Sequence, residues 1–314
     1  MKILFTLLTM VISTSLLAEY VGSPIKGATV IFLAEAGTTV KKDQPLFKLL
    51  DRSVKILIEK RKLKLKIALA DLVDKKSDIK RSKNLVSIKA ISLAMHENYV
   101  VEYYKSLLKT ERLKIKIKQA VYDLEGYIGN APYDCIVLKQ IVCVNAGTDD
   151  STYLLEIQPL DDKSSITDTS TTMKLTAAFN EQITYLPKEG QIVKKGDLLV
   201  KFDSGNLEME IKLLENSLKE ANQCLKDSTT DIERSKTLVK EKTISPKLFE
   251  DVQFLFKKCS IDVDILKLEL KETKDIINED FVVYAPYDLK ITKLILSVGS
   301  GTNDGSAILL VQKI

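Results

Sequence analysis

The chain of 314 residues contains no tryptophan, a single histidine and four cysteines, and only 6% of its residues are aromatic. One histidine, His96, cannot form a histidine cluster, and the cysteines do not have the spacing of a zinc site. The sequence also contains no glycine-rich phosphate loop. A catalytic triad would depend on His96, which we expect on the surface near a helix end, where no pocket forms. These absences predict a protein that is not an enzyme and that uses neither a metal nor a cofactor.

Long apolar segments are missing beyond the N-terminus. Residues 1–18, MKILFTLLTMVISTSLLA, place Lys2 before a short apolar run and end on a small residue, Ala18. This pattern predicts a secretory signal peptide, because the run is short for a membrane span of about twenty residues. We therefore expect export, with anchoring in the membrane as the alternative if the signal is not cleaved. The net charge of +4 is too small to indicate a nucleic acid partner.

The most prominent feature of the sequence is an internal repeat. Residues 78–92, D-I-K-R-S-K-N-L-V-S-I-K-A-I-S, recur 153 positions later as D-I-E-R-S-K-T-L-V-K-E-K-T-I-S, with ten of fifteen residues identical. Unrelated segments would match at about one position in fifteen, so we infer a tandem duplication. Charged residues make up 29% of the chain, and lysine, leucine and isoleucine are abundant, which favours long exposed helices over a large aromatic core.

Each copy begins and ends with a segment of β-strand character. V-K-K-D-Q-P-L-F-K-L-L at residues 40–50 matches V-K-K-G-D-L-L-V-K-F-D at 193–203, where apolar and polar residues alternate as in strands. A-P-Y-D occurs at 131–134 and again at 285–288, now 154 positions apart. The offset therefore changes by one residue within the second helix of a copy or where the chain leaves that helix.

Two long helices are expected between the β segments of each copy. In copy 2, apolar residues recur at alternating spacings of four and three, which is typical of a coiled-coil seam. The first seam consists of Leu207, Ile211, Leu214, Leu218, Ala221, Leu225, Ser228 and Ile232, and the second of Phe249, Val252, Phe256, Cys259, Val263, Leu266 and Leu270. Ser245 and Pro246 predict the N-cap and first turn of the second helix. Copy 1 has the same plan with Ser92 as the cap, although Arg61 and Lys75 interrupt its seam.

These segments predict an α+β fold in which two tandem split β modules are each interrupted by a long antiparallel coiled-coil hairpin. Copy 1 is expected at 19–157, with β halves at 20–51 and 129–157 and the hairpin at 52–127. Copy 2 is expected at 175–314, with β halves at 176–203 and 281–314 and the hairpin at 204–279. Residues 158–174, rich in Ser, Thr and Asp, predict a linker. Neither β half has enough apolar surface to fold alone, so the halves should pair.

This plan resembles the periplasmic adaptor (membrane fusion, HlyD-like) proteins of bacterial tripartite efflux and type I secretion systems. Besides the V-K-K and A-P-Y-D segments, the resemblance includes a triplet at each expected tip: an arginine, a leucine four positions later and a serine seven positions after that. These residues are Arg81, Leu85, Ser92, Arg234, Leu238 and Ser245. The resemblance implies that each β module is a lipoyl-like barrel-sandwich hybrid. Family members usually have one hairpin per chain and continue into a β-barrel and a membrane-proximal domain, which do not follow copy 2 here.

The resemblance also implies partners. The tip triplets would contact an outer-membrane channel protein, and the chain would bridge that channel to an inner-membrane transporter of the ABC or RND type. A structural role is the alternative for two triplet residues, because the serine can cap the second helix and the leucine can close the last seam layer. The arginines have no such structural explanation in the sequence, and a guanidinium group offers several donors to a partner's carboxylates or carbonyls.

The two hairpins differ in charge. Residues 51–125 contain 19 basic and 10 acidic residues, whereas residues 203–280 contain 13 basic and 18 acidic ones. Two solvated helical faces are the simpler explanation, but opposite signs favour hairpins that lie side by side. We therefore expect a homo-oligomer, and three chains would supply six hairpins of alternating sign.

The cysteines suggest one covalent link. Cys224 and Cys259 are equally far from the midpoint of the expected tip, so they should face each other across the hairpin. An exported protein can form this disulfide, and two buried thiols are the alternative. Cys135 and Cys143 are expected on one strand, too far apart to bridge.

Two other functions fit parts of the pattern. A structural or interaction coiled-coil protein of the envelope would keep the hairpins without a role in transport. A lipoyl- or biotin-type carrier would need an exposed lysine on a tight turn between the β halves, a place that the hairpin occupies. Met173 and Lys174 resemble a biotin attachment pair but are expected in the linker.

Overall fold

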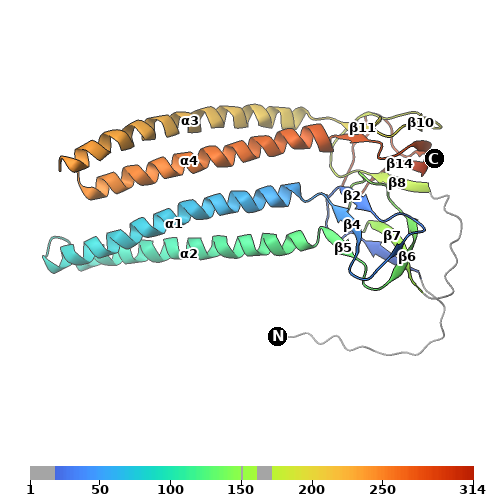
Figure 1. Ribbon diagram of the computed structural model, residues 1–314. Helices are drawn as coiled ribbons and strands as arrows, with labels where there is room; N and C mark the ends of the chain where they lie inside the picture. The colour runs from blue at the N-terminus through green and yellow to red at the C-terminus, as the bar shows by residue number, and fades with distance from the viewer. Residues whose placement is uncertain (1–17, 150, 161–171) are drawn as a thin grey trace, which may run out of the picture.

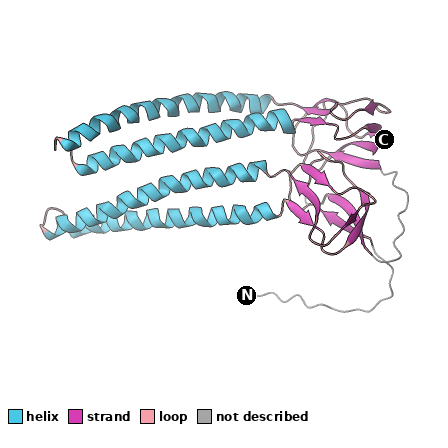
Figure 2. Ribbon diagram, in the orientation of Figure 1, coloured by secondary structure: helices cyan, strands magenta, loops and turns pink. Residues whose placement is uncertain are grey.

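The structure, a computed structural model, describes residues 18–149, 151–160 and 172–314. Two helical hairpins project in the same direction from a base of β-strands (Figures 1 and 2). The predicted signal peptide lies outside the described residues except for Ala18. Within the described ranges, no helix combines the length and the apolar character that crossing a bilayer requires.

The described elements form two units with the same order of strands and helices. The first unit consists of β1 (Glu19–Gly22), β2 (Val30–Leu33), β3 (Thr39–Val40), β4 (Pro45–Leu49), α1 (Arg52–Ser87), α2 (Leu93–Glu125), β5 (Ile128–Asn130), β6 (Cys135–Gln140) and β7 (Tyr153–Pro159). The second consists of β8 (Thr172–Thr176), β9 (Ile183–Tyr185), β10 (Ile192–Val193), β11 (Leu198–Phe202), α3 (Gly205–Lys240), α4 (Pro246–Asp275), a π-helical turn η1 (Ile276–Asp280), β12 (Val282–Tyr284), β13 (Leu289–Leu294) and β14 (Ala307–Lys313).

Each hairpin is inserted between two strands that are hydrogen-bonded neighbours. Strand β4 pairs with β5, and β11 pairs with β12, both antiparallel. The first unit contains the sheets β2-β4-β5 and β1-β7-β6-β3, and the second contains β9-β11-β12 and β8-β14-β13-β10. The described part of the chain is therefore α+β with antiparallel sheets, and the β halves on either side of each hairpin pair as the sequence predicts.

The segment between the units is shorter than the linker that the sequence predicts. Strand β7 continues to Pro159, and β8 already begins at Thr172, so the expectation of a linker over all of 158–174 is wrong at both ends. Met173 and Lys174 consequently lie in a strand, where they pair with Val311 and Leu310 of β14. Residues 172–176, T-M-K-L-T, form a strand because apolar and polar side chains alternate: those at 173 and 175 are buried, and the lysine between them is exposed.

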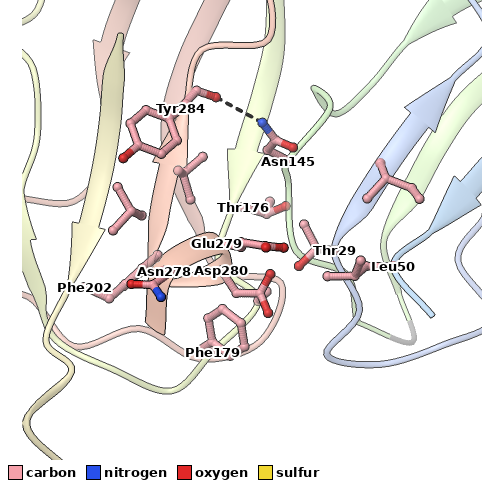
Figure 3. Close-up of a pocket in the computed structure, with 14 residues that line it drawn as sticks. Thr29, Leu50, Asn145, Thr176, Phe179, Phe202, Asn278, Glu279, Asp280 and Tyr284 are labelled. Carbon is pink, nitrogen blue, oxygen red and sulfur yellow. Dashed lines mark hydrogen bonds between the residues drawn. The ribbon is translucent and has the colours of Figure 1, made fainter. Parts of the chain in front are cut away.

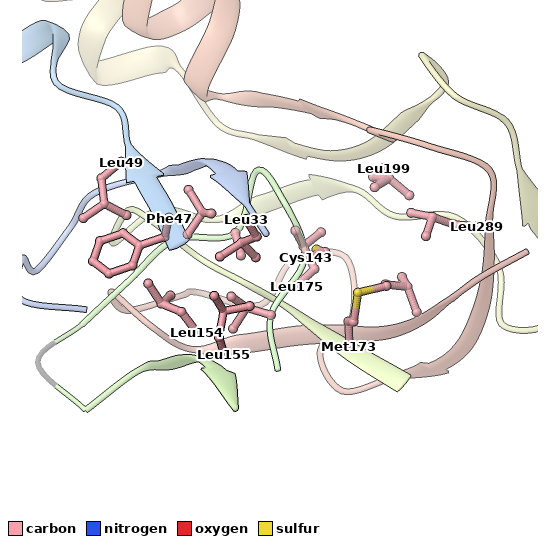
Figure 4. Packing of buried hydrophobic residues seen from close by; sticks show 14 of the residues in the cluster. Leu33, Phe47, Leu49, Cys143, Leu154, Leu155, Met173, Leu175, Leu199 and Leu289 are labelled. Carbon is pink, nitrogen blue, oxygen red and sulfur yellow. The ribbon is translucent and has the colours of Figure 1, made fainter. Parts of the chain in front are cut away.

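The two units are joined along the edge of β8 that does not pair with β14. Val142 forms a parallel bridge with Lys174, and the Gly147 amide donates a hydrogen bond of 2.8 Å to the carbonyl of Thr176. A Cβ atom on Gly147 would lie 2.2 Å from backbone atoms of Ala177 and Ala178, so only glycine allows this approach. The buried side chains of both units accordingly form one continuous apolar cluster, part of which Figure 4 shows around Leu33, Leu155, Leu175 and Leu289.

The hairpins are held together along the seams that the heptad pattern predicts. None of the seam residues of copy 2 is fully exposed, and Ser228, Cys259 and Val263 are buried. Arg61, which interrupts the seam of copy 1, donates a hydrogen bond of 2.6 Å from Nη1 to the carbonyl of Lys116 on α2. A long side chain can cover the seam with its aliphatic part while its charged end reaches a polar partner, which explains how the arginine is tolerated.

The π-helical turn accounts for the change of repeat offset. A π-helical turn forms hydrogen bonds from residue i to i+5 and therefore uses one residue more than an α-helical turn. Residues 276–280 form such a turn at the end of α4, whereas α2 ends at Glu125 without one. The single extra residue of copy 2 is therefore placed where the chain leaves its second long helix.

Candidate functional site

The four long helices lie in one row, in the order α2, α1, α4, α3 (Figure 1). The contact between the hairpins is made by α1 and α4 and contains ion pairs at three levels. At the base, Arg52 lies 2.8 Å from Asp280, and eight positions farther along α1 Lys60 lies 3.4 Å from Glu269. Near the tips, Lys247 lies 2.6 Å from Asp74. The basic hairpin therefore packs beside the acidic one, as the charge pattern predicts.

Both tips have the same turn. The Ala90 amide donates to the carbonyl of Leu85, and the Lys89 amide donates to that of Val86. This pair of bonds is the Schellman motif, which ends a helix with one left-handed residue. Lys89 occupies the left-handed position with φ 56°. At the second tip, Lys242 has φ 58° and the corresponding hydrogen bonds come from residues 242 and 243.

The tip turn explains the spacing of leucine and serine in the triplets. Leu85 and Leu238 provide the carbonyls that close the two Schellman motifs. Ser92 and Ser245 are N-caps whose side chains accept hydrogen bonds of 3.2 Å from the amides of residues 95 and 248. The predicted capping role of both serines is confirmed, and the seven-residue step from leucine to serine is the length of the turn.

The two arginines of the triplets have different surroundings. Arg81 is 32% exposed and forms ion pairs with Asp78 at 2.9 Å and with Glu250 of α4 at 2.6 Å. Arg234 is 68% exposed, and the nearest carboxylate, that of Asp231, is 3.7 Å away. Arg81 thus ties its hairpin to the neighbouring one, while Arg234 points to solvent with its donors largely free.

Lys247 is a tip residue that sequence reasoning missed. Its Nζ atom lies 2.6 Å from Asp74, 2.9 Å from Asp251 and 3.3 Å from Asp78. Burial opposes the charged form of Lys247, but hydrogen bonds and attraction from these carboxylates outweigh it and raise the pKa of the amine above its usual value. No pattern within one hairpin could reveal this cluster, because Asp74 and Asp78 belong to the other hairpin.

His96 is less exposed than the sequence suggests. Its Nδ1 atom lies 2.8 Å from the Oγ atom of Ser82, which is buried on α1. The expectation of a surface position therefore holds only in part: the residue is half-buried and faces the opposite helix near the tip, where the seam contains polar side chains.

The cysteines of the second hairpin face each other. Cys224 and Cys259 are joined by their sulfur atoms, and their Cα atoms are 5.9 Å apart. Cys135 and Cys143 are buried free thiols, but the expectation that they share one strand is wrong, because β6 ends at Gln140. The chain bends at Ile141, and Val142 already pairs with Lys174 of β8.

A cavity of about 300 Å³ lies where the two hairpins leave the base (Figure 3). The π-helical turn contributes Asn278, Glu279 and Asp280 to its wall, and Phe179 and Tyr284 lie around it. Burial raises the pKa of Asp280 to about 6, although Arg52 donates two hydrogen bonds to its carboxylate. Sequence reasoning missed this cavity because its walls come from both units.

No family model matches the chain, and no curated protein matches it by sequence. Among solved structures, the chain is similar to membrane fusion and periplasmic adaptor proteins. The membrane fusion protein Spr0693 of Streptococcus pneumoniae R6 matches 46% of this chain and 60% of its own, with 10% identity and a TM-score of 0.37. MacA of Actinobacillus actinomycetemcomitans matches 46% and 51%, with 20% identity and a TM-score of 0.32.

The periplasmic adaptor protein EmrA matches 46% of this chain and 72% of its own, with 18% identity and a TM-score of 0.24. The match covers 60% of the Spr0693 chain and 51% of the MacA chain, so this chain spans only part of the length of both proteins. TM-scores this low describe a partial likeness of fold.

Proposed function

We propose that this chain is a periplasmic adaptor, a membrane fusion subunit of a tripartite efflux or type I secretion system. Its hairpin tips contact an outer-membrane channel, and its β base lies toward an inner-membrane transporter of the ABC or RND type. The chain acts by assembly and not by chemistry. In this proposal the two units are duplicated copies of one ancestral unit, and each β module is a lipoyl-like barrel-sandwich hybrid.

One observation supports the proposal above all others: two tips of the same construction are presented together at one end of the molecule. The ion pairs of Lys247 and Arg81 connect the hairpins close to their tips, so the ends lie at one level. Figure 1 shows both tips at the end opposite the β base. Rigid rods of α-helix about 45–55 Å long can bring a docking surface that far from the base.

The two tips do not contribute equally. Arg234 is available to a partner's carboxylates or carbonyls, whereas Arg81 would have to leave Asp78 and Glu250 first. Leu85 is 40% exposed and offers an apolar contact on the first tip. We propose that Arg234 and Leu238 form the primary contact and that Arg81, Leu85, Ser92 and Ser245 shape the surface around it.

The test is site-specific photo-crosslinking in the bacterium that encodes the chain. A photoreactive residue at Arg234 should form an adduct with an outer-membrane channel protein, identified by mass spectrometry. The matched control carries the same residue at Lys219, an exposed position farther from the tip on the same helix. Adducts at 234 with other envelope proteins and never with a channel would favour a structural coiled-coil protein instead and would overturn the adaptor proposal.

A further inference from the structure

The side of α2 that faces away from α1 carries a row of exposed apolar residues. Val101, Leu108, Ile115 and Tyr122 follow one another at seven-residue steps and are 49% to 69% exposed, and Tyr104 lies beside them. We call these five residues the α2 stripe. The buried residues of α2, such as Ser106 and Thr110, lie on the opposite side of the helix, against α1. No other described helix has more than two large exposed hydrophobic residues at this spacing.

The α2 stripe supplies one apolar position per heptad, which is half of a coiled-coil seam, and Tyr104 adds the second position in a single heptad. The outer side of a helical hairpin is normally occupied by charged residues, because it faces water. An apolar residue at every seventh position over about 32 Å of helix is instead what a second helix covers. Helix α2 lies at the edge of the row of four helices, so the stripe faces outward from the molecule (Figure 1).

The charges beside the stripe have opposite signs on its two flanks. On one flank lie Glu97, Glu111 and Glu125, with Lys118 as the exception. On the other flank lie Lys105 and Arg112. In a parallel pair of helices, residues on one flank of the first helix meet the opposite flank of the second, whereas in an antiparallel pair equal flanks meet. Two copies of α2 therefore attract each other when they are parallel and repel when they are antiparallel.

We infer that α2 of one chain pairs in parallel with α2 of a second copy of the same chain. Val101, Leu108, Ile115 and Tyr122 then each meet their own counterpart. Glu111 of each copy, which is 2.7 Å from Lys114 of its own helix, faces Arg112 of the other copy. Both copies present their tips in the same direction. This pairing does not depend on the adaptor function.

If three chains instead closed into a ring of six hairpins with alternating sign, the stripe would lie against α3 of the next copy. The outward row of α3 begins with Met209 but continues with Asn216, Gln223, Thr230 and Thr237. Polar side chains cannot cover the stripe as well as a second apolar stripe does. The composition of the two outer helices therefore favours the α2 pair over the ring.

The oligomeric state of the full chain tests the inference. Light scattering after size-exclusion chromatography should give a dimer for the natural chain. Leu108→Lys with Ile115→Lys should raise the dimer dissociation constant by roughly tenfold or more for each substitution. The matched control is Met209→Lys with Leu213→Lys, both 64% exposed on α3, which should leave the dimer unchanged. A monomeric natural chain, or equal effects of both double variants, would overturn the inference.

A charge exchange distinguishes the α2 pair from the ring. Glu111→Arg alone and Arg112→Glu alone each place like charges opposite each other in the parallel pair and should weaken it. The double variant restores opposite charges and should recover the dimer. In the ring, where level positions set Glu111 near Lys219 and Arg112 near Glu220, the double variant should be weaker than either single one. That result would refute the α2 pair.

Cysteine crosslinking gives the register. Ile115→Cys should form a disulfide-linked dimer with itself, and so should Val101→Cys, because a parallel pair aligns equal positions. Met209→Cys is the control and should stay uncrosslinked, as should the natural chain. Crosslinks that form only when Ile115→Cys is mixed with Asn216→Cys would show the ring instead.

Discussion

Gly147 lies where the backbones of the two β units approach each other closely, and its replacement by alanine tests how strongly the units are joined. An added Cβ atom would lie 2.2 Å from three backbone atoms at residues 177 and 178, where ordinary contacts exceed 3.4 Å. The backbones must therefore separate by more than 1 Å, which weakens the 2.8 Å hydrogen bond from Gly147 to Thr176. Overpacking of this kind costs about 1–3 kcal/mol, occasionally more.

The chain provides its own control. Gly301 is the equivalent residue of the second unit, and a Cβ atom there would meet nothing within 4 Å. Gly301→Ala should be neutral or should stabilise the protein by about 0.4–1 kcal/mol, because alanine restricts the unfolded chain. Gly147→Ala and Gly301→Ala should therefore differ by about 1.5–4 kcal/mol in the free energy of unfolding.

Urea unfolding followed by circular dichroism measures this difference, and hydrogen exchange of the Gly147 amide locates it. Exchange should become faster in Gly147→Ala and should remain unchanged in Gly301→Ala. Equal urea midpoints for the two variants would refute the close packing of β8 between the units.

Three further predictions concern the hairpins. Lys242→Gly should stabilise the protein by about 1 kcal/mol because glycine adopts the left-handed φ of 58° without strain. Lys236→Gly, at an exposed position inside α3, should instead destabilise it by a similar amount, as thermal unfolding would show. Burial raises the pKa of Asp280 from 3.8 to about 6, so the carboxyl group binds a proton more tightly in the folded chain than in the unfolded chain. The free energy of unfolding should therefore fall as the pH rises from about 4 to about 6. Asp280→Asn should remove that slope, on the order of 2 kcal/mol, and identical pH profiles would contradict the raised pKa. Reducing the bond between Cys224 and Cys259, which closes a loop with a separation of 35 residues, should lower stability by about 3–4 kcal/mol, and two free thiols in the unreduced protein would contradict the bond.

The hairpins were predictable because their determinants are local. Seam spacing, the caps at Ser92 and Ser245 and the proline at 246 act within a few residues, so the sequence specifies both rods and their ends. The pairing of β halves followed from the same reasoning, since neither half can bury its apolar residues alone.

What the sequence could not show arises from contacts between the two copies. The partner of Arg81 on α4, Glu250, is 169 positions away, and Lys247 finds Asp74 at a separation of 173. The repeat itself was misleading here, because it suggests that Arg81 and Arg234 are equivalent. Their surroundings differ since α1 lies inside the row of helices and α3 lies at its edge. The strand β8 was missed because five residues of alternation are a weak signal beside a stretch of serine and threonine.

The ion pairs between α1 and α4 have a consequence for recognition by any partner with repeated subunits. Because ion pairs join the hairpins at the base, a short distance above it and near the tips, their ends keep a fixed separation. Once one end has docked, the other is confined to a small volume beside it, and its local concentration no longer depends on how much protein is present. Two weak contacts can then act with the strength of one tight contact, provided that the partner's sites repeat at the same spacing. Removing the ion pairs between α1 and α4 would therefore reduce binding, although none of the residues that contact the partner would have changed.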